Sequence, residues 1–283
     1  MTKDHKYGIF VFRRDHRLYD NSALIIAHNQ CERVIPIFIF TPEQVSEKNS
    51  FRSTKSIQFM IESLMNLSND IETKSGKLHC FYGEPEKIIG SIMKYLGAND
   101  TCVFLNADYT PYSKKRDLKI IKAVGKDNVK FCHDYALYQP GTILNKSGEP
   151  FQKFTPFYNV CLNVTVRKPT EIKTWNFLSL DTNVLKQENI TLAQAMKKFV
   201  GTNNGPSFFT GGRDAGILKM KAGLKLINYD NLRNDLNTPT TQMSPYLKYG
   251  CISVREFFHK IKDKMGLDSA LLRQLIWRDF YLH

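Results

Sequence analysis

The feature that most constrains the fold is a regular alternation of short apolar runs with amphipathic runs through the first 135 residues. The apolar runs are rich in β-branched and aromatic residues, as buried strands are, and lie at 7–12, 34–40, 77–82, 101–106 and 129–133. The runs between them repeat apolar residues at helical spacing and lie at 21–29, 55–73, 85–96 and 112–124. The alternation predicts an α/β fold with a doubly wound, Rossmann-like parallel sheet of five strands, covered by helices on both faces.

The pattern changes near residue 139, where glycine and proline become frequent and no period is sustained. This segment is predicted to be a long connector on the surface of two domains. Helical periodicity returns beyond residue 192, at 192–200, 213–229, 244–249, 253–265 and 269–281. We therefore divide the chain into an α/β domain at 1–138, a connector at 139–191 and an all-helical domain at 192–283.

Charge and composition restrict the partners and the compartment. A formal net charge of +13 makes a polyanion the first partner to consider, although charge alone leaves DNA, RNA and membrane lipid open. No apolar run approaches the ~20 residues that cross a bilayer, and the amino-terminal residues lead directly into a predicted strand. We expect an intracellular protein, cytoplasmic or nuclear, that is neither secreted nor anchored in a membrane. The six cysteines are widely spaced and form no zinc pattern, so we expect reduced thiols and no metal site.

The segment FRRDHRLYDNSAL, residues 12–24, follows the first predicted strand. Arginines alternate here with acidic and amide side chains, namely Arg13, Arg14 and Arg17 with Asp15, Asp20 and Asn21. Such a segment can tie a strand end to a helix start through charge-assisted hydrogen bonds. We favour this structural ion-pair network over a phosphate or cofactor cradle, because no glycine-rich loop accompanies it.

The segment TTQMSPYLKYG, residues 240–250, places the hydroxyls of Thr240, Thr241 and Ser244 at the mouth of a predicted helix that Pro245 opens. Free backbone N–H groups, the positive end of the helix dipole and short hydroxyls together suit a diphosphate. Ordinary capping by Ser244 explains the same residues equally well. The spacing does not decide between the two.

The last helical segment, within QLIWRDFYLH, residues 274–283, has two unlike faces. One face carries Gln274, Trp277, Arg278 and Tyr281, and the other carries mostly Leu272, Leu275, Ile276 and Phe280. A tryptophan beside an arginine suits stacking on a flat base. The commoner alternative is a half-buried tryptophan at a domain interface.

These three segments, together with FQKFTPFYNVCL at 151–162, resemble in their order and separation the motifs of the DNA photolyase/cryptochrome family. In that family the W-R-[DE]-F helix lies part-way through the helical flavin domain. The resemblance therefore implies a chain truncated within its FAD-binding domain. The missing part would carry most of the flavin pocket and the tryptophan chain that photoreduces the flavin, and only Trp175 and Trp277 occur here.

The family's functional residues can be carried over one at a time. The resemblance implies cofactor-binding roles for the flavin-phosphate tyrosine, the diphosphate loop and a flavin-site arginine, which match Tyr229, Thr240, Thr241, Gln242, Met243, Ser244 and Arg278. It implies a DNA contact for Arg233. Gln274 and Trp277 match the catalytic residues that face the flipped pyrimidine dimer, and Tyr281 would border the same cavity.

The implied chemistry is light-driven repair of UV-damaged DNA, in which FAD supplies the electron and the protein supplies binding and base extrusion. Folate-antenna members hold the pterin with an Asn-Glu pair where this chain has Tyr112 and Ser113. This departure argues against folate and leaves a flavin antenna, a deazaflavin antenna or none. Gln274 and SPYLKYGCIS resemble the (6-4) photolyases and animal cryptochromes, whereas KFTPFY resembles the cyclobutane-dimer enzymes, so the lesion stays open.

Three functions therefore compete. The chain can be part of a repair lyase that needs a separate C-terminal photolyase segment, an inactive remnant or DNA-binding module without flavin, or a cryptochrome-like light sensor. We expect the isolated chain to be inactive, because a shortened flavin site loses both contacts and preorganisation.

Overall fold

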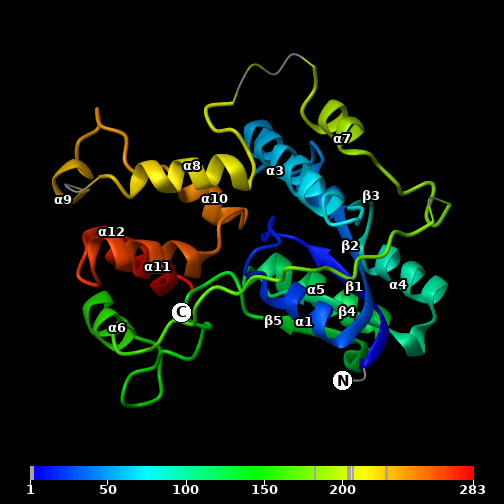
Figure 1. The fold of residues 1–283 in the computed structure, drawn as a ribbon, viewed down its shortest axis with the longest axis horizontal. Coiled ribbons are helices and arrows are strands. Elements are labelled where there is room, and N and C mark those ends of the chain that lie inside the picture. The colour runs from blue at the N-terminus through cyan, green and yellow to red at the C-terminus, as the bar shows by residue number, and fades with distance from the viewer. Residues whose placement is uncertain (1–2, 182, 203–204, 206, 227–228) are drawn as a thin grey trace.

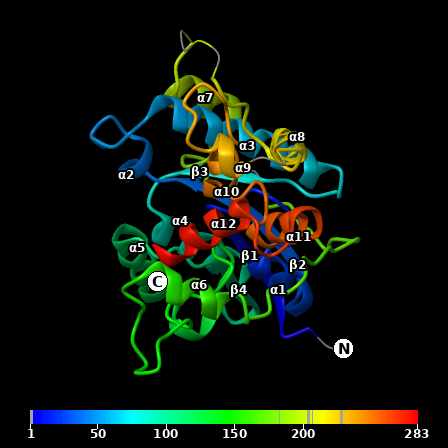
Figure 2. The same cartoon turned by 90° about the vertical axis from the view of Figure 1, so that its left-hand side faces the viewer.

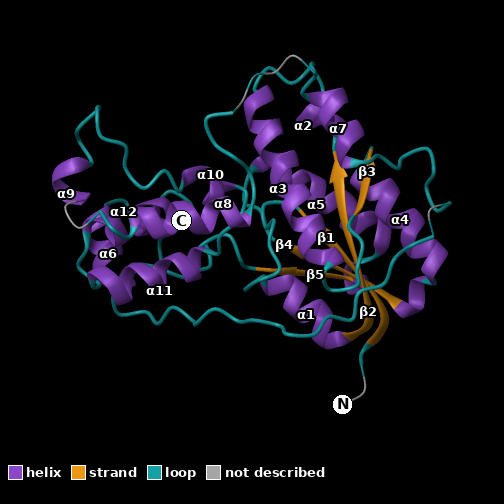
Figure 3. Ribbon diagram, turned by 45° about the horizontal axis from the view of Figure 1, so that its top comes forward, coloured by secondary structure: helices purple, strands orange, loops and turns teal. Residues whose placement is uncertain are grey.

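The computed structural model describes residues 3–181, 183–202, 205, 207–226 and 229–283. Its first half contains a five-stranded sheet formed by β1 (His5–Phe12), β2 (Cys31–Phe40), β3 (His79–Tyr82), β4 (Thr101–Asn106) and β5 (Val129–Cys132). The strand order is β3-β2-β1-β4-β5, and every neighbouring pair is parallel (Figures 1 and 3). The predicted sheet is thus confirmed, with β4 at its predicted ends and β1 and β2 starting earlier than predicted.

Helices cover both faces of the sheet. The helices α1 (Ser22–Gln30) and α3 (Thr54–Glu72) share a core with Phe10 and Phe12 of β1. On the opposite face, α4 (Pro85–Leu96) and α5 (Pro111–Val124) share a core with Ile9 and Val11. Successive residues of a strand point to opposite faces, so β1 is buried on both sides, as its continuous apolar sequence requires.

The segment between the sheet and the later helices is more structured than predicted. It contains the helix α6 (Phe154–Cys161), which the sequence analysis treated as part of an irregular connector. Pro156 obscured this helix, but a proline in the first turn costs nothing because the N–H groups there have no partner within the helix. The segment also lies along the sheet, where it forms isolated bridges from Phe177 to Val34 and from Asn189 to Phe81.

The second half is helical, with α7 (Leu192–Phe199), α8 (Arg213–Gly223), α9 (Tyr229–Leu232), α10 (Ser244–Lys248), α11 (Val254–Met265) and α12 (Ala270–Phe280). The predicted helix at 213–229 is too long, because α8 ends at Gly223, a residue of low helix propensity. The helix α7 packs on α3, and Ala195 and Phe199 join the core of the sheet. The other helices share a separate core with α6, and α12 contacts both α6 and α9 (Figure 2). The domain boundaries at 138 and 191 stay predictions.

Three further observations concern the described residues only. No helix there is long and apolar enough to cross a bilayer. Nor does that part of the chain bring three or more His, Cys, Asp or Glu side chains together in a group suited to a metal ion. The six cysteines are all free thiols.

Candidate functional site

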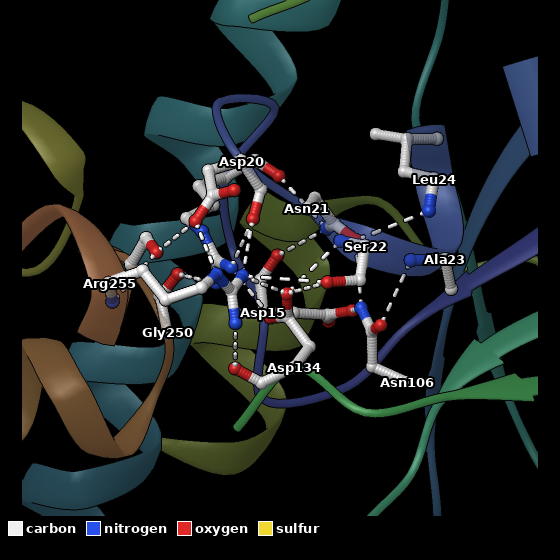
Figure 4. A network of polar contacts seen from close by, with 12 residues as sticks. Asp15, Asp20, Asn21, Ser22, Ala23, Leu24, Asn106, Asp134, Gly250 and Arg255 are labelled. Carbon is white, nitrogen blue, oxygen red and sulfur yellow. Dashed lines mark hydrogen bonds and ion pairs between the residues drawn. The ribbon is translucent and has the colours of Figure 1, made fainter. Parts of the chain in front are cut away.

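A buried network of charges connects the loop after β1 to α11 (Figure 4). Arg255 donates to Asp20 at 2.8 Å and to Asp134 at 2.6 Å, and Arg17 donates to the other oxygen of Asp134 at 2.6 Å. Arg17 also donates to the carbonyl of Gly250 at 3.1 Å. Burial favours the neutral form of Asp134, but Arg17 and Arg255 outweigh it and hold the pKa of this carboxyl well below its usual range. The structural interpretation of Arg17 is confirmed.

A cavity of about 250 Å³ opens at the carboxyl ends of β1, β2 and β4. This is the edge at which the strand order reverses, where α/β proteins bind ligands. The lining carries five cationic side chains against one carboxylate, Asp108; the cations are Arg13, Arg14, Arg52, Arg116 and Lys248. Arg13 and Arg116 both pair with Asp117, and Arg14 lies 3.4 Å from Asp108. The lining thus keeps a positive balance and suits an anion.

Part of α12 faces away from the core, as predicted. Leu272, Leu275 and Ile276 are buried, whereas Tyr281 just after the helix is 79% exposed. Gln274 is half-buried. The Trp277 ring stacks on Phe154 of α6 with centroids 3.7 Å apart and planes 8° from parallel, and it lies 5.7 Å from the Tyr281 ring.

Arg278 lies over the ring of Tyr135 at 4.1 Å. Its Nη2 is buried and has no hydrogen-bond partner in the described part of the chain. A buried guanidinium nitrogen without an acceptor is costly, so this nitrogen is suited to an anionic or carbonyl group from outside the described residues. The observation fits the flavin-site role that the resemblance implies.

The remaining sequence-predicted residues surround α8 and α9. Tyr229 is half-buried in the same apolar cluster as Trp277 and Met243, and the exposed Arg233 pairs with Asp230 at 3.2 Å. Gln242 has a left-handed backbone, φ 54°, and accepts a hydrogen bond from Lys219 at 2.6 Å.

The segment 240–244 leads into α10 without a side-chain cap. Capping by Ser244, one of the two alternatives that the spacing left open, is contradicted, because α10 begins at Ser244 and Met243 occupies the cap position without a side-chain hydrogen bond. Thr240 and Thr241 are half-buried, and the hydroxyl-bearing side chains are therefore not used as caps of α10.

Asp279, which is fully buried on α12, is not among the residues predicted from the sequence. Its Oδ2 accepts the backbone N–H groups of Leu137 at 2.6 Å and Tyr138 at 3.1 Å. Burial raises the pKa of Asp279 to about 6, although Arg278 and the two N–H groups act in the opposite direction. The signal was present, since Asp279 lies on the helix face that Leu272 and Ile276 otherwise make apolar.

Comparison with known proteins agrees with this geometry. The family model described as DNA photolyase matches residues 9–173, which is more than half of the chain. The chain belongs to the DNA photolyase family. The solved structure of an archaeal photolyase from Sulfolobus tokodaii, which holds two FAD molecules, is 32% identical, with a TM-score of 0.78. It covers 98% of this chain, and this chain covers 58% of it.

Curated relatives give the same family at lower identity. A deoxyribodipyrimidine photo-lyase of Buchnera aphidicola is 28% identical across 96% of this chain and 58% of its own length. A (6-4)DNA photolyase of Arabidopsis thaliana is 24% identical across 95% of this chain and 53% of its own length. The chain therefore spans a little more than half the length of these photolyase relatives, one of which is named for the (6-4) lesion.

Proposed function

We propose that this chain supplies the α/β domain and the first helices of the flavin domain of a DNA photolyase, which splits UV-induced pyrimidine dimers by light-driven electron transfer from reduced FAD. The observation that supports this proposal is that α9, Met243 and α12 share one apolar cluster, against which both Tyr229 and Trp277 pack. Because relatives are nearly twice as long, activity requires the rest of the flavin domain, from further residues or a separate C-terminal photolyase segment. Such an enzyme would act in the cytoplasm or nucleus.

The residues of this chain would bind and orient, and bound FAD would supply the electron. Thr240, Thr241 and Ser244 offer hydroxyls, and Gln242 and Met243 offer backbone N–H groups, to a flavin diphosphate. The unpaired nitrogen of Arg278 would meet the flavin. Gln274 would bond the flipped base and Trp277 would border it, with Tyr281 at the rim and Arg233 on the DNA phosphates.

A second chromophore site is favoured by the cavity at the carboxyl edge of the sheet. Its positive lining suits a flavin or deazaflavin that carries phosphate or another anionic group. Tyr112 donates to or accepts from Thr41 at 3.1 Å, and Ser113 is buried against Thr110, so neither offers the Asn-Glu pair that holds folate in the family. We propose an antenna of the flavin type.

The test is reconstitution with a complementary C-terminal segment taken from a photolyase relative. We expect a flavin absorption band that survives gel filtration, and blue-light repair of an oligonucleotide that carries either a cyclobutane dimer or a (6-4) lesion. Trp277→Ala should abolish repair, whereas Lys94→Ala on the exposed face of α4 should not. Assaying both lesions assigns the substrate.

Two other outcomes would contradict the proposal in different ways. Retained flavin without repair of either lesion would favour a cryptochrome-like sensor. No flavin under any condition would favour an inactive remnant or a DNA-binding module, and salt-dependent binding to undamaged duplex would separate these two.

A further inference from the structure

A tyrosine and a histidine meet at the carboxyl edge of the sheet, outside the residues discussed above. Tyr109 follows β4 and His133 follows β5 directly. Since β4 and β5 are parallel neighbours, with Asn106 opposite Cys132, their carboxyl ends bring these two side chains together. The Tyr109 hydroxyl lies 2.6 Å from Nδ1 of His133, and the two rings are only 6° from parallel.

The two groups are in the protonation states that a coupled transfer needs. Burial, together with the charges of Asp134, Asp279 and Asp108, raises the pKa of Tyr109 to about 12, so the resting phenol keeps its proton. Burial lowers the pKa of His133 below its usual value of 6.5, so the imidazole is neutral at pH 7. With the imidazole protonated at Nε2, its Nδ1 accepts the phenolic hydrogen bond.

This arrangement lowers the cost of removing one electron from the phenol. A phenol that loses an electron becomes a strong acid, and a base already within hydrogen-bonding distance takes its proton in the same step.

The location of the pair is consistent with an electron donor to a chromophore. Asp108, the residue before Tyr109, lines the cavity at the sheet edge, and Asp279 of α12 is one of the charges that raise the pKa of Tyr109. The sequence has only two tryptophans to serve as alternative donors. Trp277 is stacked on Phe154, and Trp175 is stacked on Phe177 at 5.1 Å.

We propose that Tyr109 and His133 form a proton-coupled electron donor to a light-excited, oxidised flavin. The Tyr109 ring would give one electron to that flavin. The O–H bond of Tyr109 breaks, and its proton moves to Nδ1 of His133, which leaves a neutral tyrosyl radical and an imidazolium. Return of the electron and the proton restores the pair. The cellular relevance rests on the proposed flavin antenna, but the chemistry of the pair can be tested without it.

The experiment uses the full chain and soluble flavin mononucleotide as the photo-oxidant. After a laser flash, the rate of tyrosyl-radical formation is followed by transient absorption, and the oxidised residue is located by spin trapping and peptide mass spectrometry. Tyr109→Phe should remove the fast phase. His133→Gln and His133→Phe should slow oxidation at position 109 by about tenfold or more, because a positioned base commonly contributes at least that much.

The pH dependence of the Tyr109 oxidation rate provides a second test, which needs no variant. Oxidation of Tyr109 should slow as the pH falls through the pKa of His133, because the protonated imidazole cannot accept the phenolic proton. Tyr95 on α4 is 57% exposed and makes no hydrogen bond to histidine in the described part of the chain, so its oxidation should not change over this pH range. Tyr95→Phe is the matched control and should leave the fast phase intact.

Two results would overturn the proposal. Equal oxidation rates at position 109 in the wild type and in a folded His133→Gln variant would reduce the pair to a structural hydrogen bond, and so would a rate that is independent of pH. Failure of the sheet-edge cavity to retain flavin would instead refute the antenna proposal and leave this measurement unaffected, because the photo-oxidant here is free in solution.

Discussion

Replacement of Asp134 by asparagine tests whether the buried charge network holds the two halves of the protein together. The substitution leaves Arg17 and Arg255 buried with one carboxylate fewer, since each donates to Asp134 at 2.6 Å. At that distance one ion pair is worth about 6 kcal/mol with an effective dielectric constant of ~20, before the cost of desolvation is subtracted. Removing one partner of a buried pair costs roughly 3–5 kcal/mol in practice. We therefore expect Asp134→Asn to lower the free energy of unfolding by about that amount.

The assay is urea unfolding followed by circular dichroism, with thermal melting as a second measurement. A loss of roughly 3–5 kcal/mol corresponds to a fall in the melting temperature of about 6–20 °C for a chain of this size. The control is Glu84→Gln, which removes an ion pair to Lys87 whose side chains are 46% and 74% exposed. This surface substitution should leave the unfolding midpoint unchanged.

The pH dependence of the stability difference between wild type and Asp134→Asn can refute this reasoning. The pKa of Asp134 is lower in the folded state than its unfolded value of about 3.9. Its contribution is therefore fully present above that unfolded value and is lost as the pH falls through the folded pKa. The difference between wild type and variant should be constant from pH 8 to about 5 and shrink in acid. A stability difference below about 1 kcal/mol at pH 7, or one that does not shrink in acid, would show that the network does not stabilise the contact between the two halves.

Three further predictions follow from single side chains. Because burial raises the pKa of Asp279 to about 6, its carboxylate costs stability as the pH rises from about 4 to 6; urea unfolding of Asp279→Asn against wild type should show the variant gaining up to about 3 kcal/mol across that window. Gly250→Ala should lower the free energy of unfolding by about 2 kcal/mol or more in the same assay, because the added Cβ would lie 2.1 Å from the carbonyl oxygen of Arg14. Gly266→Ala, which has open space around it and a similar φ, should lower it by only about 1 kcal/mol. Phe154→Leu should remove the stack on Trp277, increase acrylamide quenching of tryptophan fluorescence and cost about 1 kcal/mol.

The sheet was predictable because its signal is local. Each buried strand is a short continuous apolar run, and β1 shows the reason, since Ile9 and Val11 face one core while Phe10 and Phe12 face the other. The helix α6 was not predictable in the same way, because its proline marks a helix start only when the partners of the helix are known. Its apolar residues Phe154 and Phe157 pack with α12, more than a hundred residues later in the chain.

The candidate site likewise has features that could be predicted from local sequence and features that could not. The two faces of α12 follow from helical spacing, so the half-buried or exposed positions of Gln274 and Tyr281 could be predicted. The contacts of Arg278 could not, because its partner Tyr135 comes from a loop after β5. Tyr109 and His133 are likewise unremarkable in the sequence and meet only because β4 and β5 are neighbours.

The segment at 134–138, directly after β5, joins these observations. Asp134 holds both buried arginines, Tyr135 lies under Arg278, and the backbone N–H groups of Leu137 and Tyr138 are held by Asp279. The Tyr135 ring also links this segment to the sheet-edge cavity. The guanidinium carbon of Arg14, which lines that cavity, lies 5.7 Å from the ring centroid. One short segment therefore contacts both the proposed antenna site and the helix that carries the proposed dimer-binding residues.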